Sequence, residues 1–404
     1  MLSSREKIVV VTVGLPHPSK GASSVLFFEY IKALITAGYF VKLIAIAEGE
    51  QFRSSDIADL KSAIGSMNFE VMAKVCGSRV LLPNQLHIHF DKRIETEVSD
   101  EVNKFSPEIV IAFDIAAAFL LRGLRAPRKI VWLGDLRFES EWHHFRYSVK
   151  ERWRNAKHLA YALSQKLQWR RIYKTALTEF SDVIVASKSS EKAMLELGVE
   201  AAFAPYPWPN VGVVDIDTKR RFPDKPSFLF FGQLQGLGSR SSLHFVFQKL
   251  YPSLIEQWGA EGFNITIGGA RTLPSWVEAE IRRKPEISFV GFIADLTEQL
   301  SAVHAVIVPV DVPVGNRSRI ITAQAKRALV IGHRNTALGN PYLIDGKTCY
   351  LASDARGFAE AMKSAVESPV RTLKIIDEAE KCYKQSYDPE IAAKALVSLL
   401  SNSV

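Results

Sequence analysis

Short runs rich in valine and isoleucine alternate with longer segments of helical period, and this rhythm occurs twice in the 404 residues. Such runs are typical of buried strands, while apolar residues three and four positions apart are typical of helices. Strands that alternate with helices imply parallel sheets covered on both faces. The strands expected in the first half are 7–13, 40–47, 108–113, 129–134 and 182–187. Those expected in the second half are 227–232, 263–268, 287–291, 305–310, 328–332 and 348–352.

The two halves are separated by 205–226, a stretch with five prolines and no convincing period. The chain is also too long for one ordinary hydrophobic core. We therefore predict two doubly wound α/β domains. The expected boundaries are 1–205 for the N-terminal domain, 206–225 for the linker, 226–385 for the C-terminal domain and 386–404 for a closing helix. Open parallel sheets bind ligands at the carboxyl ends of their strands, so we expect the two sheets to face each other across a ligand-binding cleft.

The composition is that of a globular protein, with 47% hydrophobic and 23% charged residues. The net charge of +8 favours an anionic partner such as nucleic acid, a phosphorylated ligand or an acidic membrane surface. Cys76, Cys349 and Cys382 are widely spaced, which suits a reducing cytosol and predicts neither a disulfide framework nor a zinc site. The only Asp-x-Asp, Asp215–Asp217, falls in the expected linker, where turn carboxylates are the simpler interpretation. We expect a cytoplasmic protein with no bound metal.

Two loops that run from a strand into a helix carry the candidate chemistry. In HPSKGASS, Gly21 would let a ligand approach the backbone and Ala22 would offer a helix-end amide; the alternative is an ordinary turn capped by Ser23. In GNRSRIITAQAKRALVIGH, residues 315–333, Arg317 and Arg319 lie where the loop meets the helix. Helix-end amides and guanidinium groups together suit a diphosphate. The alternative is a pair of solvated charges, but the helix dipole disfavours arginine in a first turn.

At these segments the chain resembles a known family. KIVVVTVGLPHPSKGASSVLFFEYIKALITAGYFVKLIAI is similar to the first βαβ unit of GT-B glycosyltransferases, in particular glycosyltransferase family 4. Four later segments, 227–236, 287–310, 315–333 and 338–362, resemble that family's donor domain in order, and 386–400 resembles its closing helix. The resemblance implies two Rossmann-like domains, with the nucleotide-sugar donor in the C-terminal one and the acceptor in the N-terminal one.

The activity implied by the resemblance is sugar transfer with retention, from a UDP- or GDP-sugar to a glycan or lipid-linked acceptor in cell-surface polysaccharide or glycoconjugate biosynthesis. The chain departs from the family pattern at several positions. Val314 and Thr322 stand where the family has a Glu-x7-Glu pair, and Gln233 stands where it has an arginine. These departures keep two alternatives open: a non-catalytic GT-B partner or glycan-binding protein, and a nucleotide-sugar epimerase.

The predicted catalytic residues are Arg240, Arg319 and Asp135. The arginines would stabilise the leaving diphosphate, with Arg240 replacing a family lysine. Asp135 is either an acceptor-side carboxylate or part of an ordinary Gly-Asp turn. The predicted donor-binding residues are Gly21, Ala22, Gln233, Arg240, Arg317, Ser318, Arg319, Ile320 and Thr322. No covalently bound cofactor is expected.

Segment 146–174 holds nine lysines or arginines, one acid and five interleaved tryptophans and tyrosines. Such a helix suits the headgroup layer of an anionic membrane, which would make the protein peripheral on the inner face. The alternative is a solvated helix whose aromatic residues pack on the N-terminal domain. Nucleic acid is disfavoured because no recognised binding motif accompanies the charge.

Overall fold

The structure is a computed structural model that describes residues 6–19, 21–48, 52–77, 79–82, 85–148, 156–209 and 222–401. The chain divides into two compact units. The first unit contains Met1–Trp142, Arg154–Pro209 and Pro389–Val404, and the second contains His143–Trp153 and Asn210–Asp388. Most of the expected linker, with Asp215 and Asp217, lies outside the described residues.

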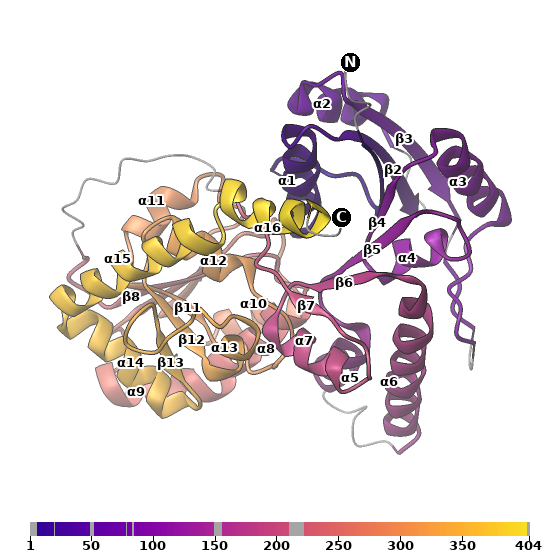
Figure 1. Ribbon diagram of the computed structural model, residues 1–404. Helices are drawn as coiled ribbons and strands as arrows, with labels where there is room; N and C mark the ends of the chain where they lie inside the picture. The colour runs from indigo at the N-terminus through magenta and orange to yellow at the C-terminus, as the bar shows by residue number, and fades with distance from the viewer. Residues whose placement is uncertain are drawn as a thin grey trace. The chain divides into compact units, whose positions relative to one another are not determined.

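The first unit is built on a parallel sheet of seven strands in the order β3-β2-β1-β4-β5-β6-β7 (Figure 1). The strands are β1 (Lys7–Val13), β2 (Phe40–Glu48), β3 (Phe69–Cys76), β4 (Ile109–Phe113), β5 (Arg128–Leu133), β6 (Asp182–Val185) and β7 (Ala202–Phe203). The five predicted strands are all present, whereas β3 and β7 escaped prediction. In β3, Glu70 and Lys74 interrupt the apolar run because this edge strand is only partly buried. β7 is only two residues long.

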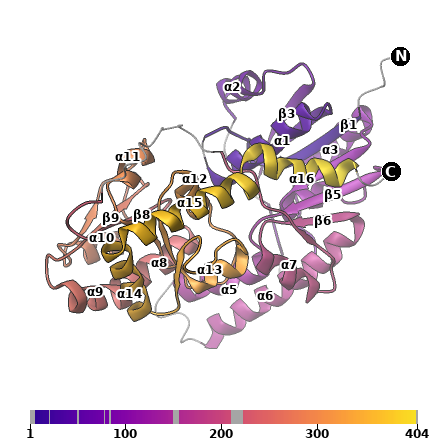
Figure 2. The ribbon, with the colours of Figure 1, turned by 60° about the vertical axis from the view of Figure 1, so that its left-hand side comes forward.

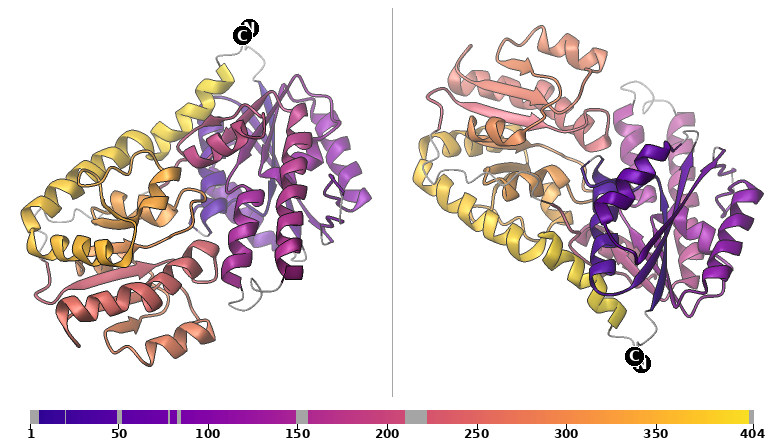
Figure 3. Two further views of the ribbon diagram at one scale, coloured as in Figure 1. Left: turned by 90° about the horizontal axis from the view of Figure 1, so that it is seen from below. Right: turned by 90° about the horizontal axis from the view of Figure 1, so that it is seen from above.

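Helices cover both faces of this sheet, as Figure 3 shows. They are α1 (Ala22–Thr36), α2 (Ser54–Ile64), α3 (Lys92–Phe105), α4 (Ile115–Leu121), α5 (Arg137–Ser148), α6 (Ala156–Ala176), η2 (Leu177–Glu179), α7 (Lys188–Leu195) and α16 (Pro389–Ser401). The closing helix α16 packs on α1, far away in sequence. Arg128 fixes its last turn by donating to the carbonyl oxygens of Leu399 at 2.8 Å and Leu400 at 3.0 Å. Those carbonyls have no partner inside the helix, so the guanidinium acts as a C-terminal cap.

The second unit has a parallel sheet of six strands in the order β10-β9-β8-β11-β12-β13. The strands are β8 (Ser227–Phe231), β9 (Asn264–Gly268), β10 (Ile287–Phe289), β11 (Ala305–Val308), β12 (Val330–His333) and β13 (Tyr350–Ala352), all within or overlapping the predicted ranges. Along β8, Phe228 and Phe230 join one buried cluster, while Leu229 and Phe231 join another. Since successive strand residues point to opposite faces, each face carries its own apolar layer.

The helices of this unit are α8 (Leu237–Phe245), α9 (Tyr251–Trp258), α10 (Ser275–Ile281), α11 (Leu296–Ser301), α12 (Ser318–Ala325), α13 (Arg334–Gly339), α14 (Ala355–Glu367) and α15 (Pro369–Ser386). A π-helical turn, Val246–Leu250, joins α8 to α9. The long helix α15 lies along α12 (Figure 2). The prediction of an α/β chain with two parallel-sheet domains is confirmed. No helix among the described residues is long and apolar enough to cross a membrane.

Candidate functional site

The candidate site of the second unit lies at the carboxyl ends of two neighbouring strands. β8 and β11 pair in parallel, with Ala305 opposite Phe228. β8 is followed by the loop 232–236 and α8, and β11 is followed by the loop 309–317 and α12. The strand order of the sheet reverses between β8 and β11, so the loops that follow these two strands diverge. The position between such loops is where open α/β sheets usually bind their ligands.

Arg319 spans from α12 to the loop after β8. Its Nη2 donates to Oγ of Ser239 at 2.6 Å, and that hydroxyl donates to the carbonyl oxygen of Gln233, also at 2.6 Å. The guanidinium carbon lies 4.7 Å from the centre of the Phe230 ring, a cation–π contact. A β-carbon placed on Gly232 would lie only 3.1 Å from Nη2, so the absence of a side chain there makes room for the guanidinium.

The charge of Arg319 is poorly solvated. Burial, followed by the charge of Arg317, lowers the pKa of Arg319 to about 9. Its Nη1 is buried and has no hydrogen-bond partner within the described part of the chain. Since a buried donor without an acceptor is costly, this nitrogen marks a position where an anion would be stabilised.

Arg317 approaches the same loop from the start of α12. It occupies the N-cap position, and its Nη2 donates to the carbonyl oxygen of Val314. A β-carbon on Gly238 would lie 3.4 Å from its guanidinium carbon, so Arg317 rests against the first turn of α8. That turn begins at Gly236 without a side-chain cap. Two guanidinium groups and the positive end of α8 therefore lie together.

The loop that carries Arg317 is fixed by buried polar groups. Asn316 donates through Nδ2 to the hydroxyl of Tyr387 at 2.9 Å and accepts through Oδ1 from Asn340 at 3.4 Å. Both Tyr387 and Asn340 are fully buried. Gly315 has a φ of +71°, which glycine adopts readily. Tyr387 and Asn340 could not be predicted to hold this loop, because they lie far from residue 316 in the chain.

The other residues predicted to bind the donor contribute less directly to this site. Arg240 lies in the first turn of α8, and among the described residues its side chain forms no hydrogen bond or ion pair. It is Arg319 that reaches the loop after β8. Gln233 contributes its carbonyl oxygen. The hydroxyl of Thr322 donates back to the carbonyl oxygen of Ser318 at 3.0 Å.

Ile320, which was predicted to bind the donor, and Val314, which stands where the family has a glutamate, are both apolar and buried. Both belong to the apolar layer that contains Val306 and Val308 of β11. Ile320 has no polar side chain and its N–H donates to the carbonyl oxygen of Arg317 at 2.9 Å, and Val314 adds no polar side chain.

The first unit holds the remaining candidates. Gly21, with a φ of +75°, is the N-cap of α1, and Ala22 is the first residue of that helix. The expected alternative cap, Ser23, therefore lies inside the helix. Asp135 follows β5 and is exposed. Burial, followed by the charge of Asp135, raises the pKa of Glu139 to about 7. Glu139, which sequence reasoning missed, stands four residues after Asp135, and its Oε2 is buried without a partner in the described chain.

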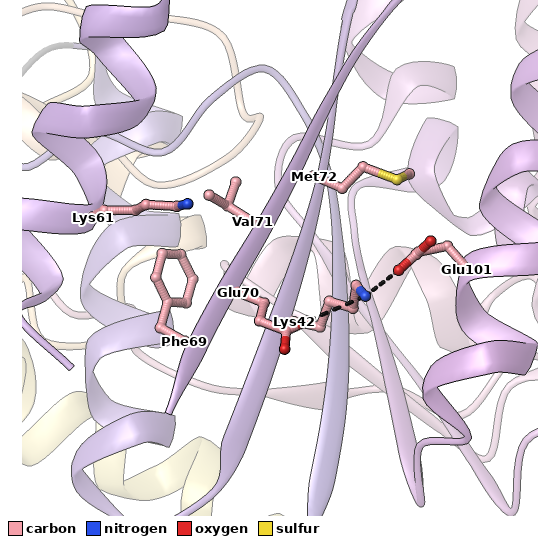
Figure 4. A pocket seen from close by; sticks show the side chains of 7 residues that line it. All are labelled: Lys42, Lys61, Phe69, Glu70, Val71, Met72 and Glu101. Carbon is pink, nitrogen blue, oxygen red and sulfur yellow. Dashed lines mark hydrogen bonds and ion pairs between the residues drawn. The ribbon is translucent and has the colours of Figure 1, made fainter. Parts of the chain in front are cut away.

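A separate pocket lies at the edge of the first sheet, away from these loops (Figure 4). Lys42 is at its centre, paired with Glu101 and with Glu70 at 3.2 Å. Burial opposes the charge of Lys42, but the two ion pairs outweigh it and raise its pKa. Because these charges are paired with one another, we interpret the pocket as an ion-pair cluster at a sheet edge and assign no ligand to it.

Comparison with known proteins agrees with this architecture. Residues 225–368, most of the second unit, match the sequence profile of the family described as glycosyl transferases group 1. The second unit is therefore a glycosyltransferase domain, as the resemblance in the sequence predicts. No curated protein matches the chain closely by sequence.

Solved structures with the same fold cover nearly the whole chain. A sucrose-phosphate synthase from Thermosynechococcus elongatus is 15% identical, with a TM-score of 0.66 over 98% of both chains. HepE from Anabaena, solved with UDP and glucose, is 14% identical, with a TM-score of 0.68 over 98% of this chain and 100% of its own. A variant of TarM from S. aureus, solved with UDP, fondaparinux and α-GlcNAc-glycerol, is 10% identical, with a TM-score of 0.69 over 98% and 100%. The fold is thus GT-B.

Proposed function

We propose that this protein is a retaining glycosyltransferase of the family 4 type that uses a nucleotide-sugar donor. The observation that carries the proposal is the buried Nη1 of Arg319, which has no hydrogen-bond partner among the described residues and lies beside Arg317 at the first turn of α8. A diphosphate supplies what this arrangement lacks, namely negative charge and several acceptor oxygens. The glycosyltransferase profile over residues 225–368 supports a sugar nucleotide over other diphosphates.

The proposed chemistry follows from charge. Breaking the bond between the sugar and the diphosphate builds negative charge on the leaving oxygens and positive character on the anomeric carbon. Guanidinium groups and helix-end amides that are already in place stabilise this charge without reorganising during the reaction. Arg319 is fixed by Ser239 and Phe230, so it meets that condition. Arg317 and the amide of Ser318 would complete the site, since the amide of Ile320 already donates to the carbonyl oxygen of Arg317 at 2.9 Å.

The donor we favour is a UDP-sugar, since two proteins of the same fold, HepE and TarM, have been solved with UDP. A glycan or lipid-linked acceptor follows from the same comparison with TarM and from the family resemblance. Asp135 and Glu139 are the carboxyl groups we propose on the acceptor side, because the pKa of Glu139 near 7 lets it exchange a proton at neutral pH.

The test is incubation of the protein with a panel of UDP- and GDP-sugars and a membrane extract, followed by mass spectrometry of the products. We expect sugar transfer, or slow donor hydrolysis, with at least one donor, and its loss in Arg319→Ala at unchanged fold. Activity that survives in Arg319→Ala at the wild-type level contradicts the assignment of the phosphate site.

A second candidate function is a non-catalytic GT-B protein that binds a partner transferase or a glycan. This candidate is favoured by Val314 and Thr322, which stand where the family has glutamates. Val314 is buried and apolar, and the hydroxyl of Thr322 donates to a carbonyl oxygen of its own helix. Calorimetric titration separates the candidates. Nucleotide binding at micromolar to millimolar concentration supports the donor site, whereas absence of binding at millimolar UDP and GDP supports the non-catalytic candidate.

A further inference from the structure

Helix α6 of the first unit presents a stripe of leucines to solvent. Leu159, Leu163 and Leu167, spaced by four residues, are 37%, 46% and 56% exposed. Residues spaced in this way share one face of a helix. The opposite face is buried in the unit through Trp169 and Ile172, among others, so the exposed stripe is not the side that holds the helix in place.

The N-terminal end of α6 is exposed all round. Every residue from Ala156 to Tyr161 is exposed, and the side chain of Tyr161 is 64% exposed. Figure 1 shows this end extending beyond the other helices of the unit.

A second segment adds apolar side chains next to this helix. Gln168 of α6 donates through Nε2 to the carbonyl oxygens of Leu82 at 2.8 Å and Gln85 at 2.9 Å, which holds the 79–82 segment beside α6. Leu82 is 44% exposed and Val80 is 45% exposed. Gln168 projects from a different side of α6 than Leu167, so Leu82 and Val80 flank the leucine stripe and are not part of it. We call the stripe formed by Leu159, Leu163 and Leu167 the α6 patch.

The charged side chains of α6 itself all have one sign, and Glu139 of α5 is a carboxyl group that interacts with two of them, Lys166 and Arg170. Residues 156–176 contain five lysines and arginines and no acid, and residues 77–90 contain no acid either. Arg171 and Lys174 continue the leucine stripe toward the C-terminus of α6, and both are exposed. Long cationic side chains beside apolar ones can lay their stems on the apolar layer and keep their charges among anionic headgroups.

We propose that the α6 patch docks this protein on an anionic lipid surface. The three leucines would enter the headgroup layer, and the cations around them would contact lipid phosphates. A second copy of this chain does not fit the patch, since two identical patches related by a two-fold axis would oppose positive charge to positive charge. The inference rests on α6 alone and stands whether or not the proposed donor site is correct.

The test is co-sedimentation of the full chain with vesicles of phosphatidylcholine and with vesicles that also contain about 30% phosphatidylglycerol, a composition chosen to supply surface charge. We expect binding to the anionic vesicles and at least about tenfold weaker binding to the neutral ones. The double variant Leu163→Gln with Leu167→Gln should weaken anionic binding about tenfold without changing charge. Arg171→Glu with Lys174→Glu should weaken it by a similar factor, and salt should weaken it in the wild type.

The matched control is Leu195→Gln, which changes a 71% exposed leucine on α7 of the same unit and should leave binding unchanged. All the changed side chains are exposed, and thermal melts check that each variant is folded. The proposal is overturned if the wild type does not bind, if it binds both vesicles equally, or if the control loses as much as the leucine pair. It is also overturned if light scattering shows a dimer that the leucine pair abolishes, since the patch is then a protein interface.

Discussion

Replacing Arg319 with methionine should make the unliganded second unit more stable and should remove most of its stabilisation by UDP. The shift of the pKa of Arg319 from 12.5 to about 9 corresponds to at most about 5 kcal/mol of disfavoured charge. The side chain as a whole is only half-buried, and solvent screening reduces this figure to ~2–3 kcal/mol. Because a pKa of about 9 lies above 7, the charge and its cost are both present at neutral pH.

Methionine would also lose favourable contacts. The hydrogen bond to Ser239 contributes ~1 kcal/mol, and the cation contact with Phe230 contributes a similar amount, part of which a thioether recovers. The net expectation is a gain of ~1 kcal/mol. For a unit of this size, that gain raises the melting temperature by ~2–4 °C.

Scanning calorimetry with and without UDP measures both effects. At a UDP concentration of about 100 times its Kd, the wild type should gain ~2.7 kcal/mol. Loss of a charge-assisted pair of hydrogen bonds, worth ~2–3 kcal/mol, should raise the Kd about 100-fold and leave a gain of ~0.4 kcal/mol in Arg319→Met. The control is Arg356→Met on α14, where the side chain is 91% exposed and neither effect is expected. A variant that melts below the wild type, or keeps the full UDP response, refutes the reasoning.

Three further predictions concern single positions. Gly232→Ala should raise the Kd for UDP about tenfold, because the added β-carbon would push on Arg319. Gly291 also has a positive φ, +76°, but has open space around it, so Gly291→Ala should leave the Kd unchanged. Titration calorimetry compares the two variants. Tyr387→Phe removes the acceptor of Asn316 and should cost ~1 kcal/mol of stability with a severalfold rise in the donor KM; a loss of stability at unchanged KM would show that the bond does not position the loop. For Glu139, the pKa is raised from 4.5 to about 7, so the native carboxyl keeps a proton that the unfolded one releases, and wild-type stability should fall as the pH rises from about 4.5 to about 7. Glu139→Gln has no carboxyl group to ionise and lacks this loss. In thermal melts from about pH 4 to about pH 8, the stability of the variant relative to the wild type should therefore rise by up to ~2 kcal/mol. A constant difference across that range would contradict the raised pKa of Glu139.

The central strands could be predicted because they are buried on both faces and need uninterrupted apolar runs. β1 and β4 meet this description, with every inner residue fully or almost fully buried. An edge strand has no such requirement, and β3 therefore reads like a mixed polar segment. The two-residue β7 exists only because β6 offers it a partner, which is a tertiary effect that no local pattern records.

Only those features of the candidate site that follow from the order of strands, loops and helices along the chain could be predicted. The order of strand, loop and helix placed Arg317 and Arg319 at a helix start, and the structure has them there. Which side chain reaches which loop depends on packing between elements 80 residues apart, as Arg319 and Ser239 show. The choice of Arg240 followed from its register with a family lysine, and its role in binding the donor stays a prediction. The pKa of Glu139 likewise follows from burial that the sequence does not state.

The position of Arg319 gives a physical reason for the departure at Gln233. A side chain that reaches across from α12 needs space above the end of β8 and a fixed acceptor at the start of α8. Gly232 provides the space, and the hydroxyl of Ser239, itself bound to the carbonyl oxygen of Gln233, provides the acceptor. A further arginine at 233 would bring a third guanidinium near two that already repel each other. Positive charge at this loop therefore comes from α12, and the anion affinity we propose depends on how α12 packs against α8.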